Sequence, residues 1–265
     1  MIVRVGGFFS GIGAHHSACM RAGIPGVEFQ VKWQCDIDPY KVDAYNRMHG
    51  EVPNLGDISE VRDLDGEREI DLLFYTPSCQ NISAAGRKEG NTEGSGTSSS
   101  LVFEVPRILA ATKARPSVLI MEEVPMMVAK RFKANFDIIL ERLSELGYRH
   151  SWKVVNATDF GVGQNRRRLI CVSVLGREPP MFPEPKGSFR PLRDYLEPHE
   201  TVPDSYFLTE ERLKGVIWSS DKESGRGNGF RFQPCPPPIR QACKHNQHKI
   251  RTEDKHAHHY RSGCL

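Results

Sequence analysis

The stretch that decides the fold is residues 71–83, which read Asp-Leu-Leu-Phe-Tyr-Thr-Pro-Ser-Cys-Gln-Asn-Ile-Ser. Its apolar beginning predicts a short buried strand, and a long Gly/Ser-rich segment that ends near Ser100 follows it. Cys79 therefore stands just beyond the carboxyl end of a strand, where an α/β enzyme would place a nucleophile. A lone cysteine is more commonly a buried core residue, so this stretch by itself leaves both interpretations open.

Length and composition limit the classes of protein to consider. The 265 residues suffice for one large domain, or for one domain and a smaller one, and the formal net charge is +3. No run approaches the roughly 20 apolar residues of a membrane span, and the N-terminus lacks the pattern of a secretory signal. Seven irregularly spaced cysteines then indicate reduced thiols, so we expect a cytoplasmic protein without a membrane partner.

Towards the N-terminus, residues 2–9 predict a first strand, which leads through Gly11 and Gly13 into a helix that stops at Gly23. A strand, a glycine turn and a helix form the usual cradle of a nucleotide-like cofactor, because glycine lets the backbone approach the ligand closely. The dinucleotide fingerprint needs a third glycine, and His16 occupies that position. The sequence therefore disfavours a dehydrogenase that binds a pyrophosphate here.

Three aspartates follow the second expected strand, residues 29–35. Asp36 stands at the end of this strand, where a carboxylate can accept hydrogen bonds from two ribose hydroxyls. Asp38 precedes Pro39 and is expected to cap the next helix. Asp57 follows a Pro-Asn turn and is either a group beside a cofactor base or an ordinary turn residue.

The Gly/Ser-rich segment at residues 80–100 is either a flexible linker or a loop that closes over a substrate. Its place inside the expected domain favours the loop, because long structureless connections are uncommon there unless they are functional.

Beyond this segment, residues 116–121 predict a strand that ends in Glu122 and Glu123, which are either solvated acids or partners of a substrate. Arg166 and Arg168 stand at the start of another expected strand, on the same face of it. They either form a solvated basic edge or contact a phosphate or a base. Other expected elements are the helices at 101–109 and 132–146 and the strands at 151–156 and 169–174.

A change in composition at Gly176, followed by four prolines up to Pro185, marks a domain boundary. We expect one domain at residues 1–175, a partial second one at 176–234, and a poorly ordered, His/Pro-rich tail at 235–265.

The tail carries six Lys/Arg against two Asp/Glu. This basic charge is compatible with binding to nucleic acid or with a tail that is simply solvated. Its Cys235, Cys243, His245 and His248 match no common zinc-finger spacing, so no metal site is expected.

Six motifs at expected strand ends, taken in order, resemble the motif set of the DNA cytosine-5 methyltransferases of bacteria and phages. They are Phe9-Ser10-Gly11-Ile12-Gly13, Asp36, Asp57, Pro77-Ser78-Cys79-Gln80, Glu122-Glu123-Val124 and Gln164-Asn165-Arg166-Arg167-Arg168. The resemblance covers residues 1 to about 175 well and continues more faintly through 190–196 and 227–232. It implies a Rossmann-like, S-adenosylmethionine-dependent methyltransferase fold, with a mixed, mostly parallel seven-stranded sheet and a partial target-recognition domain.

The resemblance also implies a reaction, the transfer of a methyl group from S-adenosyl-L-methionine to C5 of a flipped-out cytosine in double-stranded DNA. Cys79 would attack C6 as a thiolate, with its pKa lowered by nearby cations. Glu122 would contact the N3/N4 edge of the base, and Arg166 and Arg168 its O2 side and the backbone. By the same resemblance, the cofactor would be held by Phe9, Gly11, Gly13, Asp36, Ile37, Asp57, Ile58 and Pro77, and the substrate by Gln80, Ser83 and Gln164.

At five positions the chain differs from the residue usual in this family, namely Gly7, Ser78, Ser98, Glu123 and Gly163. The second carboxylate, Glu123, is expected to raise the pKa of Glu122 or to repel the thiolate. The last family motifs, an Arg-rich helix and a segment that returns beside the glycine turn, are not recognisable after residue 234. An enzyme of restriction–modification or phage protection is expected. The alternatives are a truncated or degenerate member that binds cofactor or DNA without turnover, and one half of a split methyltransferase completed by a second chain.

Overall fold

The computed structural model of the chain describes residues 1–82, 91–187, 192–198 and 201–225. The chain divides into two compact units, Met1–Phe189 and Arg190–Leu265. Ser83, residues 227–232 and the tail at 235–265 lie outside the described residues. The expectations placed on them, and the expected domain limits, therefore stay predictions.

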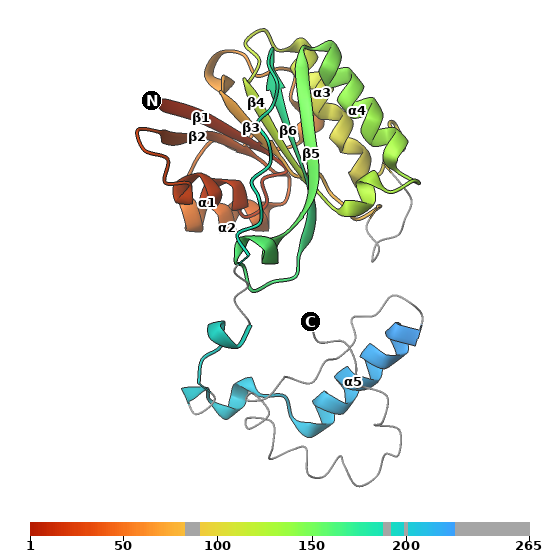
Figure 1. Ribbon diagram of the computed structural model, residues 1–265. Helices are drawn as coiled ribbons and strands as arrows, with labels where there is room; N and C mark the ends of the chain where they lie inside the picture. Colours follow the sequence, from red (N-terminus) through yellow and green to blue (C-terminus); the bar gives the residue numbers. More distant parts are fainter. Residues whose placement is uncertain (83–90, 188–191, 199–200, 226–265) are drawn as a thin grey trace. The chain divides into compact units, whose positions relative to one another are not determined.

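The first unit is built on one mixed sheet (Figure 1). Its strands are β1 (Ile2–Phe8), β2 (Glu28–Cys35), β3 (Leu72–Tyr75), β4 (Val118–Glu123), β5 (Tyr148–Asn156) and β6 (Arg167–Leu175). Their order is β2-β1-β3-β4-β6-β5; β1 to β4 pair in parallel, and β6 runs antiparallel to both of its neighbours. Because parallel strands end at the same edge, the residues that follow β1, β2, β3 and β4 gather there.

Two pairs of helices cover opposite faces of this sheet (Figure 1). His15, from the first pair, contacts Phe74 of β3, with 5.7 Å between the ring centroids. Leu73, the preceding residue of the same strand, packs into the core cluster with side chains of the second pair. Successive residues of a strand point to opposite faces, so these two contacts mark the two sides. The helices are α1 (Ala14–Arg21) and α2 (Pro39–His49), then α3 (Glu104–Ala111) and α4 (Lys133–Glu145).

Local sequence signals set the beginnings of the helices. The Asp38 side chain accepts a hydrogen bond from the Tyr40 backbone N–H at 3.0 Å, and Pro39 is the first residue of α2, so the expected cap is confirmed. Pro106 lies in the first turn of α3, where the missing N–H of proline is harmless.

The described residues form six strands of the sheet, one fewer than the seven that were predicted. The seventh would have to lie between β2 and β3, since the other expected strands are all present. This connection contains α2 and two short 3-10 helices, Ile58–Glu60 and Gly66–Arg68. Among the described residues, this connection pairs with the sheet only at an isolated parallel bridge between Asn54 and Gln34 of β2.

The second unit contributes helical segments only, within its described residues. These are the short 3-10 helices Leu192–Tyr195 and Asp204–Tyr206, and the helix α5 (Glu210–Gly225). The expected loss of α/β alternation after residue 176 is confirmed as far as this part of the chain is described. No helix of the described residues is both long enough and apolar enough to cross a membrane.

Candidate active site

The turn after β1 brings backbone amides to the edge of the sheet. Phe9 (φ +55°), Gly11 (φ +53°) and Gly13 (φ +85°) all have left-handed backbone conformations, and Phe9 is the one non-glycine residue of the described chain that does. A Cβ atom on Gly13 would lie 2.6 Å from the His49 ring and 2.8 Å from Tyr45, so only glycine fits there. The predicted glycine turn is therefore present, packed closely against α2.

Asp36, after β2, is tied to this turn by the backbone. Its Oδ2 accepts a hydrogen bond from the Gly11 N–H at 2.9 Å, and its Oδ1 accepts one from the Asp38 N–H at 3.0 Å. The Lys41 ammonium group lies 3.9 Å from Oδ1. These contacts hold the carboxylate in one orientation at the wall of a cavity.

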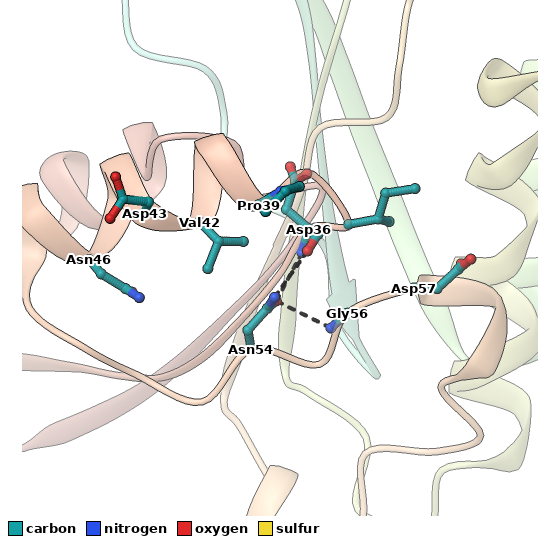
Figure 2. Close-up of a pocket in the computed structure, with 9 residues that line it drawn as sticks. Asp36, Pro39, Val42, Asp43, Asn46, Asn54, Gly56 and Asp57 are labelled. Carbon is teal, nitrogen blue, oxygen red and sulfur yellow. Dashed lines mark hydrogen bonds between the residues drawn. The ribbon is translucent and has the colours of Figure 1, made fainter.

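The cavity has a volume of about 470 Å³ and lies between α2 and the turn before the first 3-10 helix (Figure 2). Three residues predicted to bind a cofactor line it: Asp36, Ile37 and Asp57. Ile58 belongs to the buried core instead, with 2% of its surface exposed. The other lining residues are Pro39, Val42, Asp43, Asn46, Asn54 and Gly56.

Asn54 is a part of this cavity that sequence reasoning missed. Its side-chain oxygen accepts hydrogen bonds from the backbone N–H groups of Asp36 and Gly56, and its amide group donates to the Asp36 carbonyl (Figure 2). Asn54 therefore fixes the backbone on both sides of the cavity. An asparagine two residues before Gly56 was a signal for such a turn, but its partner Asp36 is distant in sequence.

The nucleophile candidate follows β3 at the same edge of the sheet. Thr76, the first residue after β3, donates its hydroxyl hydrogen to the Phe9 carbonyl at 2.9 Å, which links this segment to the glycine turn. Sequence reasoning missed this link. Pro77 is buried, and the Cys79 side chain is half-buried against the core.

The ends of β4 and β6 supply the charged groups. Arg168 Nε lies 2.6 Å from Glu122 Oε1, and the Arg166 guanidinium approaches the same oxygen at 3.9 Å. The antiparallel register, in which Glu123 stands opposite Leu169, brings the start of β6 beside the end of β4. The structure thus brings together the predicted residues Glu122, Arg166 and Arg168.

The pKa of the Cys79 thiol is raised above its ordinary value. Burial is the main cause, and the nearby Glu123 carboxylate is the second. Arg168 lowers this pKa, but its guanidinium is already paired with Glu122, which itself raises it. The expectation that cations lower the pKa of Cys79 is therefore wrong for the site without ligands, because burial and the two carboxylates outweigh Arg168.

Glu123 differs from its neighbour Glu122 because it is only 3% exposed. Burial raises the pKa of its carboxyl group to about 8, and the charge of Glu122 acts in the same direction. The Val124 N–H donates a hydrogen bond to Glu123 Oε2 at 2.8 Å, which lowers the pKa in part. Glu123 is therefore largely protonated at neutral pH. When ionised it raises the pKa of Cys79, which agrees with the expected repulsion of the thiolate, while its expected effect on Glu122 stays a prediction.

Two predicted substrate-binding residues, Gln80 and Gln164, have exposed side chains. Ser83, the third, lies outside the described residues. Their roles stay predictions. Among the described residues, no group of three or more His, Cys, Asp or Glu is arranged to hold a metal ion.

Comparison with protein families gives one match that spans nearly the whole chain. The sequence profile described as C-5 cytosine-specific DNA methylase matches residues 3–261. The match runs beyond Phe232, the last residue of the segments that carry the resemblance in the sequence.

Curated relatives of this chain include proteins from two bacteria and from a phage of Bacillus. The chain is 39% identical over 163 residues to the type II methyltransferase M2.ScrFI of Lactococcus lactis subsp. cremoris, which covers 60% of this chain and 43% of the relative. It is 33% identical over 215 residues to the type II methyltransferase M.HaeII of Haemophilus aegyptius, covering 81% and 64%. The orphan methyltransferase M.Rho11sI of Bacillus phage rho11s is 32% identical over 253 residues, covering 83% and 48%.

Solved structures agree on the fold. The Dnmt2 methyltransferase of S. pombe superposes with a TM-score of 0.62 at 22% identity, over 81% of this chain and 66% of that one. The methyltransferase EhMeth of Entamoeba histolytica gives a TM-score of 0.69 at 19% identity, over 82% and 67%. The Rossmann-like methyltransferase fold expected from the sequence is confirmed by these neighbours.

Proposed function

The chain belongs to the C-5 cytosine-specific DNA methylase family, and from this premise we propose that it methylates C5 of a cytosine in double-stranded DNA, with S-adenosylmethionine as the methyl donor. The chain spans between 43% and 64% of the length of the curated relatives described above. The names of the relatives suggest modification of bacterial or phage DNA as the biological role.

The observation that carries the proposal is the meeting of three features at one edge of the sheet. The half-buried thiol of Cys79 follows β3, the Glu122–Arg168 pair closes the ends of β4 and β6, and the glycine turn follows β1. The Thr76–Phe9 hydrogen bond connects the thiol segment to the glycine turn directly. A nucleophile, a charge pair and a cofactor cradle are the parts that this reaction needs.

The cavity fits S-adenosylmethionine. Its volume of about 470 Å³ lies in the usual range for small-molecule sites. The carboxylates of Asp36 and Asp57 line it and can accept hydrogen bonds from ribose hydroxyls, while Ile37, Pro39 and Val42 offer apolar surface to an adenine ring. We expect Asp36, Ile37 and Asp57 to hold the nucleoside, beside the backbone of the glycine turn. When bound, S-adenosylmethionine supplies an electrophilic methyl group.

The protein side chains then make the cytosine reactive. The Cys79 thiolate forms a bond to C6, and the electron pair of the C5–C6 double bond moves towards C5. Glu122 meets the N3/N4 edge of the ring, and Arg168 holds Glu122 in place while its own charge favours the thiolate. After methylation, loss of the C5 proton restores the double bond and expels the thiolate. The base must leave the duplex first, which costs about a few kcal/mol.

A covalent trapping experiment tests the proposal. The chain is incubated with S-adenosylmethionine and duplexes of varied sequence in which cytosine carries fluorine at C5, so that the C5 proton cannot be lost. We expect an adduct on a denaturing gel that is absent in Cys79→Ala. Cys19→Ala, which changes a buried cysteine of α1, serves as the control and should keep the adduct.

The second candidate function is binding of cofactor or DNA without turnover. The raised pKa of Cys79 beside Glu123 favours it, because less thiolate is present at neutral pH. Cofactor binding by calorimetry together with no adduct on any duplex would establish it for this chain alone. An adduct that forms only after addition of a second polypeptide with the family's remaining motifs would identify a split enzyme.

A further inference from the structure

The segment that carries Cys79 is closed by a ring of hydrogen bonds. On one side of the cysteine stands Ser78, and on the other Asn81; both bind to serines at the start of the 3-10 helix Ser98–Phe103. Ser99 Oγ lies 2.5 Å from the Ser78 carbonyl oxygen, and the Asn81 backbone N–H donates to Ser99 Oγ at 3.2 Å. Ser98 Oγ lies 2.9 Å from Asn81 Oδ1 and 3.2 Å from Ser78 Oγ.

The protons of this ring can be assigned, because each hydroxyl group has one hydrogen to donate. Ser99 gives its hydrogen to the Ser78 carbonyl, the shortest contact, and accepts from the Asn81 N–H. Ser98 is the donor in both of its contacts, to Asn81 Oδ1 at 2.9 Å and to Ser78 Oγ at 3.2 Å, and its one hydrogen favours the shorter contact, to Asn81. Cys79 lies within the span of these bonds.

The ring is shielded from water on its inner side. Ser99 is 2% exposed and Asn81 is 7% exposed, so their hydrogen bonds cannot be replaced by solvent. The neighbouring Ile82 is also buried, and its N–H donates to the Cys79 carbonyl at 3.1 Å. Losing one partner would leave a buried polar group unpaired and release the turn.

The serines themselves belong to a fixed part of the fold. Val102 and Phe103, in the same 3-10 helix, are buried in the core and lead directly into α3. Ser98 and Ser99 therefore tie the turn around Cys79 to a rigid element that lies well beyond this turn in the sequence.

We propose that Ser98 and Ser99 are positioning residues for the nucleophile, which hold the peptide groups before and after Cys79 so that its thiol meets C6 of the base. This inference rests on the proposed function and deepens it. A nucleophile held by a buried ring is oriented before the substrate arrives, and small displacements of such a group cost large factors in rate. The proposal predicts a loss of reaction rate without a loss of ligand binding.

The test compares four variants of the full chain. Ser99→Ala removes the three contacts of the central hydroxyl, to the Ser78 carbonyl and to the Asn81 N–H and Oδ1. Ser99→Thr keeps the hydroxyl, and Ser78→Ala removes only the 3.2 Å contact. Ser100→Ala is the matched control, because Ser100 is the neighbouring buried serine and, among the described residues, its hydroxyl bonds only within its own turn, to the Thr97 carbonyl. Two quantities are measured: the rate of adduct formation at saturating fluorocytosine duplex, and the rate at which iodoacetamide modifies Cys79, followed by peptide mass spectrometry.

We expect Ser99→Ala to slow adduct formation about ten- to a hundredfold, with unchanged dissociation constants for DNA and S-adenosylhomocysteine. Its Cys79 should react several times faster with iodoacetamide, since a released turn exposes the thiol. Ser99→Thr should restore most of the adduct rate, Ser78→Ala should lose less than Ser99→Ala, and Ser100→Ala should match the wild type.

An adduct rate in Ser99→Ala equal to that in Ser100→Ala would overturn the inference. So would a loss of cofactor binding in Ser99→Ala, since that would indicate general unfolding. A wild-type chain that forms no adduct would refute the proposed function instead. In that case the iodoacetamide rates, which need neither DNA nor cofactor, still decide whether the ring holds Cys79.

Discussion

The cofactor end and the catalytic end of the same sheet edge are built in different ways. At the cofactor end, carboxylate and amide side chains bind backbone N–H groups two residues further on, as in the Asp36–Asp38, Asn54–Gly56 and Asp57–Ser59 pairs. At the catalytic end, side chains from separate elements bind one another, as in the Glu122–Arg168 and Ser78–Ser98 contacts. Short pieces of sequence therefore shape the turns of the cofactor end, which Gly11–Asp36 and Asn54–Asp36 bonds then join, whereas the catalytic end depends on contacts between separate elements throughout.

The electrostatics of the two ends differ in the same sense. At the cofactor end, backbone N–H groups and Lys41 hold the Asp36 carboxylate, and burial with Asp36 and Asp57 raises the pKa of Cys35 to about 12. At the catalytic end, burial and neighbouring carboxylates raise the pKa of Cys79 and bring the pKa of Glu123 to about 8. The perturbed groups of the catalytic end include the nucleophile itself, as is typical of sites where chemistry takes place.

The largest effect is expected from replacing each of the two adjacent acids, one at a time. Glu122→Gln should slow single-turnover methyl transfer about 10²–10³-fold, because the partner of the base edge and of Arg168 loses its charge. Glu123→Gln should keep the rate, because the Glu123 carboxyl group has a pKa of about 8 and is already protonated at neutral pH. Methyl transfer from a radiolabelled donor measures both variants. Equal losses of rate in the two variants would mean that the two acids do not have these different roles.

The next effect concerns the glycine turn. Gly13→Ala should lower the free energy of unfolding by about 3 kcal/mol, since a methyl group would meet His49 and Tyr45 in a left-handed backbone conformation. Gly11→Ala should cost about 1 kcal/mol, because its Cβ would meet no atom within 4 Å. Urea denaturation measures both. A Gly11→Ala loss as large as that of Gly13→Ala would contradict the packing argument.

A pH series isolates Glu123. Its pKa is about 8 in the folded chain against the ordinary 4.5 of a glutamate, so the folded state holds a proton that the unfolded state has lost. The resulting stability is fully present below about pH 4.5 and is lost as the pH rises through 8. Between pH 6 and pH 8.5 the wild type should lose about 2 kcal/mol relative to Glu123→Gln. If the free energies of unfolding of the wild type and of Glu123→Gln differ by the same amount at the two pH values, Glu123 is ionised throughout.

The smallest effect should come from the cofactor end. Asn54→Ala should weaken binding of S-adenosylhomocysteine about tenfold, because the backbone on both sides of the cavity loses its clamp. Asp43→Asn, on the same wall but paired outwards with Arg47, should change the dissociation constant less than about twofold. Calorimetry gives both values. Iodoacetamide reactivity of Cys79 should stay constant, and a change would mean that the two ends are coupled.

Much of this site could be predicted because parallel strands end at one edge. The positions of Asp36, Cys79 and Glu122 after three expected strands were enough to group them, and Arg168 joins them through β6. The raised pKa of Cys79 could not be predicted, since it depends on burial and on the neighbouring Glu123. Asn54, Thr76, Ser98 and Ser99 were missed for a related reason: their partners lie far away in sequence.

The sequence by itself determined the order of the elements, the glycine turn, the cap of α2 and the family. Each of these depends on residues close together or on motifs in a fixed order, so local chemistry is sufficient. Tertiary structure alone decided that Glu123 is protonated, that Arg168 binds Glu122, and that a ring of serines encloses the cysteine turn. The physical reason is that burial and side-chain partners are set by packing between strands, which no short stretch of sequence contains.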